Sequence, residues 1–160
     1  MIRQAVEQDT GIVHDIVCRA IEDAYSKYYA PEVVDYFLDF HNVQNIQRDI
    51  SNGDTYIIEI NGECVGTGSH NGNYISRVFI HPDFQGHGYG TEIVDHLEKL
   101  ILHDYENVFL HSSVTGHPFY LKHGYSEKET VNAPITGDAV FRYTIMEKNN
   151  DNNYKSNMNK

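Results

Sequence analysis

The sequence predicts a single α/β (α+β) domain in which about four helices cover both faces of a mixed, mostly antiparallel sheet of six to seven strands. Three observations support this prediction. The chain has 160 residues, enough for one domain with a core and too few for two ordinary ones. Two short turns, NGE and NGN, join three strand-like segments into antiparallel hairpins. A strand, a helix and another strand then follow, which is the order of a parallel crossover.

The N-terminal third is expected to form one edge strand and two helices. MIRQAVE alternates as a strand does, and the next 19 or so residues (11–29) place apolar side chains at helical spacing, at Ile12, Ile16, Ala20 and Ala24. Pro31 is suited to the first turn of a second helix, which should extend to about Ile50, where SNGD ends it.

The rest of the chain is expected to supply most of the sheet. TYIIEI, CVGTGSH and YISRVFI are the three hairpin strands, and NVFLH is a short buried strand. The helix before NVFLH carries its apolar residues on one side, at Ile93, Val94, Leu97, Leu100 and Ile101. HPFYLKHGY forms a short helix that Gly124 ends, and AVFRYTIMEK belongs to one or two final strands.

Composition excludes several classes of function. Twelve Lys and Arg against 23 Asp and Glu give a formal charge of −11, which disfavours nucleic acid as a partner and favours cationic ones. No apolar run is long enough for a membrane span, and the N-terminus does not resemble a signal peptide, so a cytoplasmic location is expected. Cys18 and Cys64 are isolated, and the ten histidines show no metal-binding spacing, so we expect no disulfide and no metal.

Three glycines precede the long helix in HPDFQGHGYGTEIVDHLEKLI. A helix N-terminus presents unpaired N–H groups and partial positive charge, and glycine lets a phosphate approach the backbone closely. Gly86, Gly88 and Gly90 therefore predict an anion site. The spacing does not match a P-loop, which needs a Lys, nor a dinucleotide fingerprint, which needs G-x-G-x-x-G.

Two motifs resemble the GNAT superfamily of N-acetyltransferases. QGHGYG is similar to the family's Q/R-x-x-G-x-G/A loop, and the preceding RVFIHPDF is similar to its apolar strand followed by H-P. About thirty residues later, FYLKHGY resembles the end of the family's late helix. The element order also agrees over residues 1–148, which we take as one acetyltransferase domain, and the Asn-rich residues 149–160 as a polar, disordered tail.

The resemblance implies acetyl-CoA as the acetyl donor. Backbone N–H groups of the loop would hold its pyrophosphate, at Gln85, Gly86, His87, Gly88, Tyr89, Gly90 and Thr91. The backbone at Val78, Phe79 and Ile80 would pair with the pantetheine arm as an added strand does, and an N–H there would polarise the thioester carbonyl. Ser113 stands where many relatives have an asparagine near the pantetheine, although capping the following short helix is an equal alternative.

The resemblance further implies direct attack of an amine on the thioester. Tyr120 occupies the position of the family's general acid, and a phenol is protonated at neutral pH. The strand before the loop, Tyr74 to Val78, lacks the glutamate that many relatives use as the base. A chain of water molecules is then the simplest route for the amine's proton, with Glu59 and His111 as side-chain candidates.

The acceptor is expected to be a small, cationic primary amine. Tyr25, Tyr28 and Tyr29 lie in a segment rich in carboxylates, with Glu22, Asp23 and Asp35, and such a segment suits a cation. Two alternatives stay open from the sequence: acetylation of a protein N-terminus or lysine, and an acyl-CoA-binding module without turnover. A homodimer is a further candidate arrangement.

Overall fold

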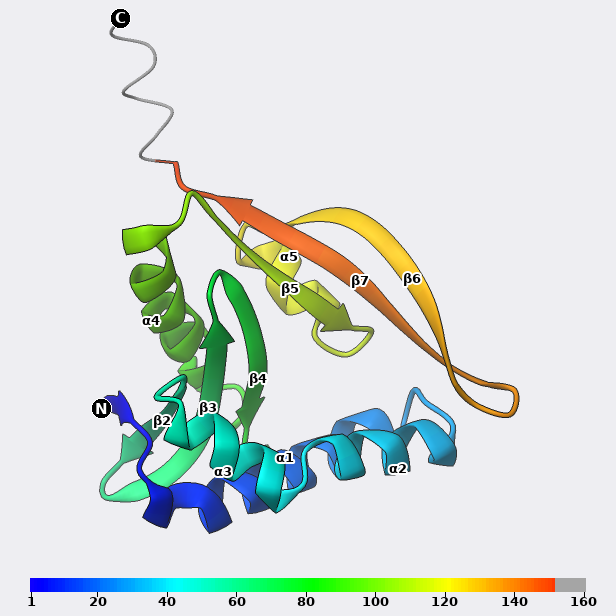
Figure 1. Ribbon diagram of the computed structural model, residues 1–160, viewed down its shortest axis with the longest axis horizontal. Helices are drawn as coiled ribbons and strands as arrows, with labels where there is room; N and C mark the ends of the chain where they lie inside the picture. The colour runs from blue at the N-terminus through cyan, green and yellow to red at the C-terminus, as the bar shows by residue number, and fades with distance from the viewer. Residues whose placement is uncertain (152–160) are drawn as a thin grey trace, which may run out of the picture.

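The protein forms one seven-stranded sheet flanked by helices, as the computed structural model in Figure 1 shows for residues 1–151, the part of the chain that it describes. The strand order is β1-β2-β3-β4-β5-β7-β6, and every neighbouring pair is antiparallel except β4 and β5. The strands are β1 (Ile2–Gln4), β2 (Thr55–Ile60), β3 (Glu63–Asn71), β4 (Tyr74–Ile80), β5 (Asn107–Ser113), β6 (Ser126–Thr136) and β7 (Ala139–Asn149). The predicted fold class is thus confirmed.

Within residues 1–151, five α-helices cover the two faces of the sheet. Two 3-10 turns, η1 (Glu7–Asp9) and η2 (Pro82–Phe84), lead into α1 and toward α4. In Figure 1, α4 lies on the left and α1 to α3 lie along the bottom. One core cluster joins α4 to β4, β5 and β7, and a second joins α1 and α3 to β2. The helices are α1 (Thr10–Tyr25), α2 (Pro31–Phe40), α3 (Val43–Ser51), α4 (Tyr89–Asp104) and α5 (His117–Lys122).

The helix expected from Pro31 to Ile50 is two helices, and this raises the number of α-helices from about four to five. The chain leaves the helical conformation at His41 (φ −98°, ψ 39°), and Asn42 is extended. The Asn42 side chain accepts a hydrogen bond from the N–H of Asn45 at 2.9 Å and so begins α3. Asparagine is among the preferred residues at this position, so the sequence held the signal.

Two predicted apolar faces differ in detail from the observed ones. Ile12 on α1 is exposed, while the buried stripe is centred on Val13, Ile16, Val17, Ala20 and Ile21. On α4, Leu100 is exposed and Glu98 is buried in its place. Glu98 accepts hydrogen bonds from the Tyr125 hydroxyl at 2.8 Å and from Lys148 Nζ at 3.0 Å. A buried carboxylate needs such partners, and they tie α4 to β7.

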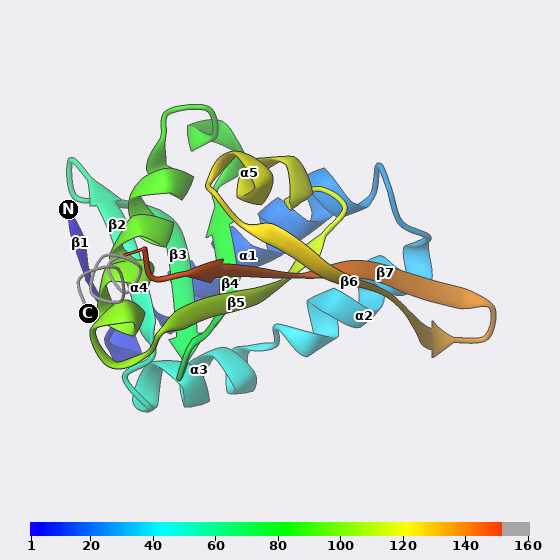
Figure 2. The same ribbon diagram turned by 90° about the horizontal axis from the view of Figure 1, so that it is seen from above.

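The strand that the sequence did not delimit, β6, pairs with β7 to form a long hairpin. Its turn lies between Thr136 and Ala139, where Gly137 has a φ of 54°. Seen from above in Figure 2, the hairpin extends beyond the rest of the sheet alongside α2. The hairpin and α2 therefore form one corner of the molecule.

The parallel strands β4 and β5 separate soon after they meet. They pair at Tyr74 with Phe109 and at Ile75 with Leu110, and at no further position. Beyond Ile75, β4 is paired with β3 on its other side, with an irregular register between Thr67 and Ser69. At this irregularity two residues of β4, Arg77 and Val78, lie opposite one residue of β3, Gly68. Arg77 has a φ of 48°, an uncommon conformation outside glycine. Residues 76–80 thus keep an open edge toward β5.

The expectation for the tail, residues 149–160, falls mostly outside the described residues: Asn149 ends β7, and residues 152–160 are not described. Within residues 1–151, no helix has the length and apolar character needed to cross a membrane.

Candidate active site

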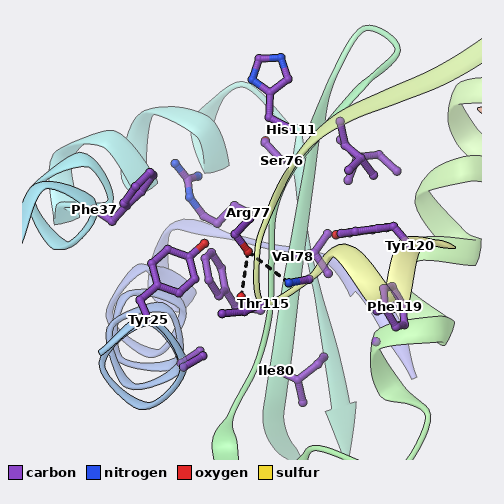
Figure 3. A pocket seen from close by; sticks show the side chains of 18 of the residues that line it. Tyr25, Phe37, Ser76, Arg77, Val78, Ile80, His111, Thr115, Phe119 and Tyr120 are labelled. Atoms are coloured by element: carbon purple, nitrogen blue, oxygen red, sulfur yellow. Dashed lines mark hydrogen bonds between the residues drawn. The ribbon is translucent and has the colours of Figure 1, made fainter. Parts of the chain in front are cut away.

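A cavity of about 870 Å³ lies where β4 and β5 separate. It extends from the glycine loop (residues 85–91) past α5 to α1, α2 and the β6–β7 hairpin, and Figure 3 shows part of its lining. Most of the residues singled out from the sequence line it, namely Tyr25, Val78, Phe79, Ile80, Gln85, Gly86, Gly88, Tyr89, Gly90, Thr91, His111, Ser113 and Tyr120. His87, Glu59, Tyr28 and Tyr29 are not among its lining residues.

The glycine loop has a conformation that requires two of its glycines. Gly86 and Gly88 have φ values of 79° and 86°, which L side chains rarely adopt, and Gly88 is the N-cap of α4. Within residues 1–151, the N–H groups of residues 86–91 meet no protein acceptor. His87 turns back on the loop, with Nδ1 3.1 Å from the Phe84 carbonyl oxygen. The unpaired N–H groups at a helix N-terminus can hold a diphosphate.

The open edge of β4 adjoins this loop. Gln85 Nε2 donates to the carbonyl oxygen of Ile80 at 3.1 Å, which fixes the loop to the end of the strand. Val78, Phe79 and Ile80 line the same cavity as the glycine loop. An extended chain with amide groups could pair along this edge as another strand would.

Tyr120 comes from α5 and meets the cavity from the opposite side. In Figure 3 its hydroxyl points toward Val78 on β4. No hydrogen-bond partner for this hydroxyl exists in the described part of the chain. Burial, with Tyr25 and Tyr74 nearby, raises the pKa of Tyr120, so the phenol keeps its proton at neutral pH. A protonated, unengaged hydroxyl can donate to an atom placed between α5 and β4.

Ser113 lies at the cavity and in the turn that leads into α5. It lines the cavity, and its Oγ lies 2.8 Å from Thr115 Oγ1 and accepts from the N–H of Gly116 at 3.3 Å. Gly116 is the N-cap of α5, and a Cβ there would lie 3.3 Å from the Tyr120 ring. The turn that Ser113 stabilises therefore also positions Tyr120.

The two side-chain candidates for the base lie in different places. His111 lines the cavity, and Figure 3 places it beside Ser76, at the end opposite Ile80. Burial lowers the pKa of His111, which favours the neutral, proton-accepting form. Glu59 on β2 is instead held by Arg3, with Oε1 2.8 Å from Nη2, and has no place in the cavity.

The residues expected to bind the acceptor are also divided. Tyr25 is buried and lines the cavity, whereas Tyr28 is 64% exposed outside it. The Tyr29 hydroxyl accepts from the N–H of Val114 at 2.8 Å, which connects the segment between α1 and α2 to the turn after β5. The carboxylates that suggested a cationic acceptor, Glu22, Asp23 and Asp35, are exposed on the helices and do not line the cavity.

A buried ionic group at the cavity was not foreseen from the sequence. Arg77 on β4 lies 2.7 Å from Asp49 Oδ2 through Nη1, and its Nε donates to His41 Nδ1 at 3.1 Å. These residues come from β4, α3 and the junction between α2 and α3. Arg77 and His41 line the cavity. Arg77 is 28 residues from Asp49 and 36 residues from His41 in the sequence, so no local pattern could predict that they pair.

Lowering the pH from 7 to 5 should cost the wild-type protein about 2 kcal/mol more stability than it costs the His41→Gln variant. Burial and the Arg77 charge lower the pKa of His41 from 6.5 to about 3. Between these values the unfolded chain binds a proton that the folded protein excludes. The free energy of unfolding therefore decreases as the pH is lowered from 6.5 toward 3, and His41 does not change it above this range. Urea unfolding at both pH values measures the difference. Equal losses in the two proteins would contradict a buried, neutral His41.

Comparison with known proteins identifies the family. The family model described as the acetyltransferase (GNAT) domain matches residues 25–149 of this chain. A GCN5-related N-acetyltransferase from Rhodopseudomonas palustris is 25% identical, with a TM-score of 0.86 over 94% of this chain and 95% of that one. A search of the curated proteins finds no match.

Two further solved structures share the fold at lower identity. The PaiA N-acetyltransferase from Thermoplasma acidophilum, solved in complex with coenzyme A, is 17% identical with a TM-score of 0.76, over 94% of this chain and 98% of its own. YncA from Salmonella typhimurium, a putative acetyltransferase solved with acetyl-CoA, is 15% identical with a TM-score of 0.67, over 93% and 92%. The family match covers most of the chain, and the three solved structures share its fold over 93% or 94% of its length: the chain belongs to the GNAT family of acetyltransferases.

Proposed function

We propose that the protein transfers the acetyl group of acetyl-CoA to the primary amine of a small acceptor by direct attack. One observation carries this proposal. A single cavity brings together the unpaired N–H groups of the glycine loop, the open edge of β4 and the free hydroxyl of Tyr120. Relatives of the same fold were solved with coenzyme A and with acetyl-CoA, which supports the choice of donor.

The cavity offers a partner for each part of the donor. The N–H groups of residues 86–91 would hold the pyrophosphate, and the β4 edge at Val78 to Ile80 would pair with the amides of the pantetheine arm. Acetyl-CoA supplies a thioester, whose carbonyl carbon accepts the nucleophile. His87, whose ring faces its own loop, would contribute its backbone N–H. Ser113 would support the site by holding the turn before α5.

Two side chains would handle protons. Tyr120 would donate its proton to the leaving sulfur, because its hydroxyl is protonated and free of protein partners among the described residues. His111 is the better placed of the two proposed bases, since it lines the cavity and is neutral near pH 7. A water molecule could connect His111 to the amine.

The acceptor end favours a small amine over a protein segment. Its walls are α2 and the β6–β7 hairpin, which contributes Ala133 and Ile135 to the lining. Walls on both sides restrict the space around the reacting amine. A cytoplasmic location and a homodimer stay predictions.

The purified protein should release CoA thiol from acetyl-CoA when a primary amine is added, and mass spectrometry should detect the N-acetylated amine. The pH profile of kcat/KM should fall on the acid side as His111 becomes protonated, below about 6.5. In His111→Gln this acid limb should disappear and kcat/KM should fall about tenfold near neutral pH.

Glu59→Gln is the matched control, because Glu59 lies outside the cavity and pairs with Arg3. It should keep the wild-type pH profile. A profile unchanged in His111→Gln but altered in Glu59→Gln would reverse the assignment, and a failure to acetylate any primary amine would remove the proposed function.

A further inference from the structure

Six aromatic side chains line the acceptor end of the cavity, and we name this set the aromatic wall. Phe37 on α2 packs against Phe141 on β7 with ring centroids 4.5 Å apart, and against Tyr25 on α1 at 5.5 Å. Phe141 stacks on Tyr143 at 5.5 Å, which extends the wall along β7. Its members are Tyr25, Tyr36, Phe37, Phe40, Phe141 and Tyr143. They come from three elements, so the fold assembles the wall at the cavity.

Two members of the wall leave large apolar surfaces uncovered. Phe40 is 51% exposed and Tyr36 is 44% exposed, and the two rings are stacked with centroids 6.3 Å apart. Both line the cavity, so their open faces are available to a ligand there. Aromatic rings gain most from burial against other aromatic rings, in stacked or edge-to-face arrangements. The uncovered surface therefore suits a flat, apolar group.

The charges around the cavity do not suit a second cationic group on the ligand. Among residues 1–151, none of those that line the cavity is Asp or Glu. In the same part of the chain Arg77 is the single Lys or Arg of the lining, and it forms an ion pair with Asp49 at 2.7 Å. His41 is neutral because it is buried. A diamine or polyamine would lose hydration of its second ammonium group in this cavity and find no carboxylate in exchange.

A single ammonium group can be accommodated. The faces of the aromatic wall attract one cation, and the amine must in any case lose a proton before it attacks. His111 stacks on Tyr143 with centroids 4.8 Å apart, so the wall continues directly to the residue proposed to take that proton. The ring-binding and proton-accepting parts of the site are thus adjacent.

From this arrangement we propose that the acceptor is an arylalkylamine, a primary amine with one positive charge and an aromatic ring one or two carbons away. The inference rests on the proposed function and narrows it, because the sequence suggested a cationic acceptor without limiting its charge. The ring would lie against the aromatic wall, and the amine would face the separation between β4 and β5. The neutral amine nitrogen forms the new bond to the acetyl carbon, the bond to sulfur breaks, and Tyr120 gives its proton to the sulfur. Of the two protons that the ammonium group loses, one leaves through His111 and the other replaces the proton that Tyr120 gave.

The experiment compares three amines under the same conditions: 2-phenylethylamine, propylamine, which lacks the ring, and 1,4-diaminobutane, which carries a second charge. We expect kcat/KM for 2-phenylethylamine to exceed that for each of the others by at least about tenfold. A diamine that is acetylated as well as or better than 2-phenylethylamine overturns the inference and leaves the proposed function standing.

Variants of two exposed aromatic residues test the wall itself. Phe40→Ala should raise KM for 2-phenylethylamine by about tenfold and leave that for propylamine unchanged. Tyr28→Ala removes an aromatic ring that is more exposed and lies outside the cavity, so it should change neither. Equal effects of the two variants, or none from Phe40→Ala, would contradict a role for the wall in acceptor binding.

Binding without turnover separates the inference from the proposed function. Isothermal titration of 2-phenylethylamine and 1,4-diaminobutane into protein saturated with CoA measures binding directly. Preferential binding of 2-phenylethylamine where no amine is acetylated would remove the proposed function and leave the aromatic wall as a binding surface for arylalkylamines. Binding of neither amine, or tighter binding of the diamine, overturns the inference.

Discussion

Replacement of Tyr120 with Phe is expected to lower kcat by about a hundredfold or more and to change KM for acetyl-CoA by less than about twofold. The variant removes one oxygen whose place in the cavity is opposite Val78 and which bonds no protein group among residues 1–151. Because no protein hydrogen bond is lost, the free energy of unfolding should stay within about 0.5 kcal/mol of the wild-type value. Steady-state kinetics of thiol release and urea unfolding measure the two effects.

Tyr125→Phe provides the opposite pattern and serves as the control. The Tyr125 hydroxyl donates to buried Glu98 at 2.8 Å, and its ring packs edge-on against Tyr120 at 5.5 Å. Its loss should reduce stability by about 1–2 kcal/mol and leave kcat nearly unchanged. If Tyr120→Phe kept the wild-type kcat, Tyr120 would be a packing residue and the leaving sulfur would need another proton source.

Introduction of a carboxylate at Gly90 is expected to abolish the stabilisation of the protein by acetyl-CoA. Gly90 is the second residue of α4 and lines the cavity, and a Cβ there would make ordinary contact with the Phe119 ring at 3.6 Å. Asp near a helix N-terminus stabilises the free protein by about 0.3–1 kcal/mol, but its charge would repel a diphosphate held by the same N–H groups. The two effects have opposite signs.

Thermal unfolding with and without acetyl-CoA separates them. At a ligand concentration a hundredfold above Kd, the wild-type protein should gain about 2.7 kcal/mol, or about 5–10 °C in Tm. Gly90→Asp should start from an equal or higher Tm and gain almost nothing. Gly11→Asp is the matched control, because Gly11 is the second residue of α1 and lies outside the cavity. A full ligand shift in Gly90→Asp would place the diphosphate elsewhere.

Local signals in the sequence were sufficient for most of the fold. Glycine-containing turns fixed the hairpins, and helical or alternating spacing identified the elements that pack on the sheet. The break at His41 and Asn42 was missed because the apolar spacing continues across it, although Asn42 is a residue preferred at a helix N-cap. The sequence predicted that Leu100 of α4 would be buried, but Glu98 is buried instead. Its burial depends on Lys148 and Tyr125, which are distant in sequence.

The site also has one part that local sequence signals predict and another part that depends on residues distant in sequence. The residues predicted for the donor lie in two short motifs, and nearly all of them line one cavity. Whether they bind acetyl-CoA stays a prediction that the experiments above address. The acceptor end could not be derived in this way, because Phe37 and Phe141 meet across 104 residues and Arg77 finds its partners on other elements. Glu59 was a candidate by its position in a strand, but strand periodicity does not say which cavity a face adjoins.

The two residue pairs between β4 and β5 are the sole backbone ladder between the first four strands and the last three within residues 1–151. The sheet therefore consists of two halves that few backbone hydrogen bonds join, and α4 packs on both. Its buried face contacts Ile75 in the first half and Val108, Leu110 and Met146 in the second. The glycine loop leads into the N-terminus of α4. A ligand held at this loop and along the β4 edge would contact both α4 and the junction between β4 and β5. Its binding free energy and the free energy that holds the two halves of the sheet together are therefore linked. A state in which the two halves are separated should bind the ligand more weakly, by the same free energy that the bound ligand contributes to holding the halves together.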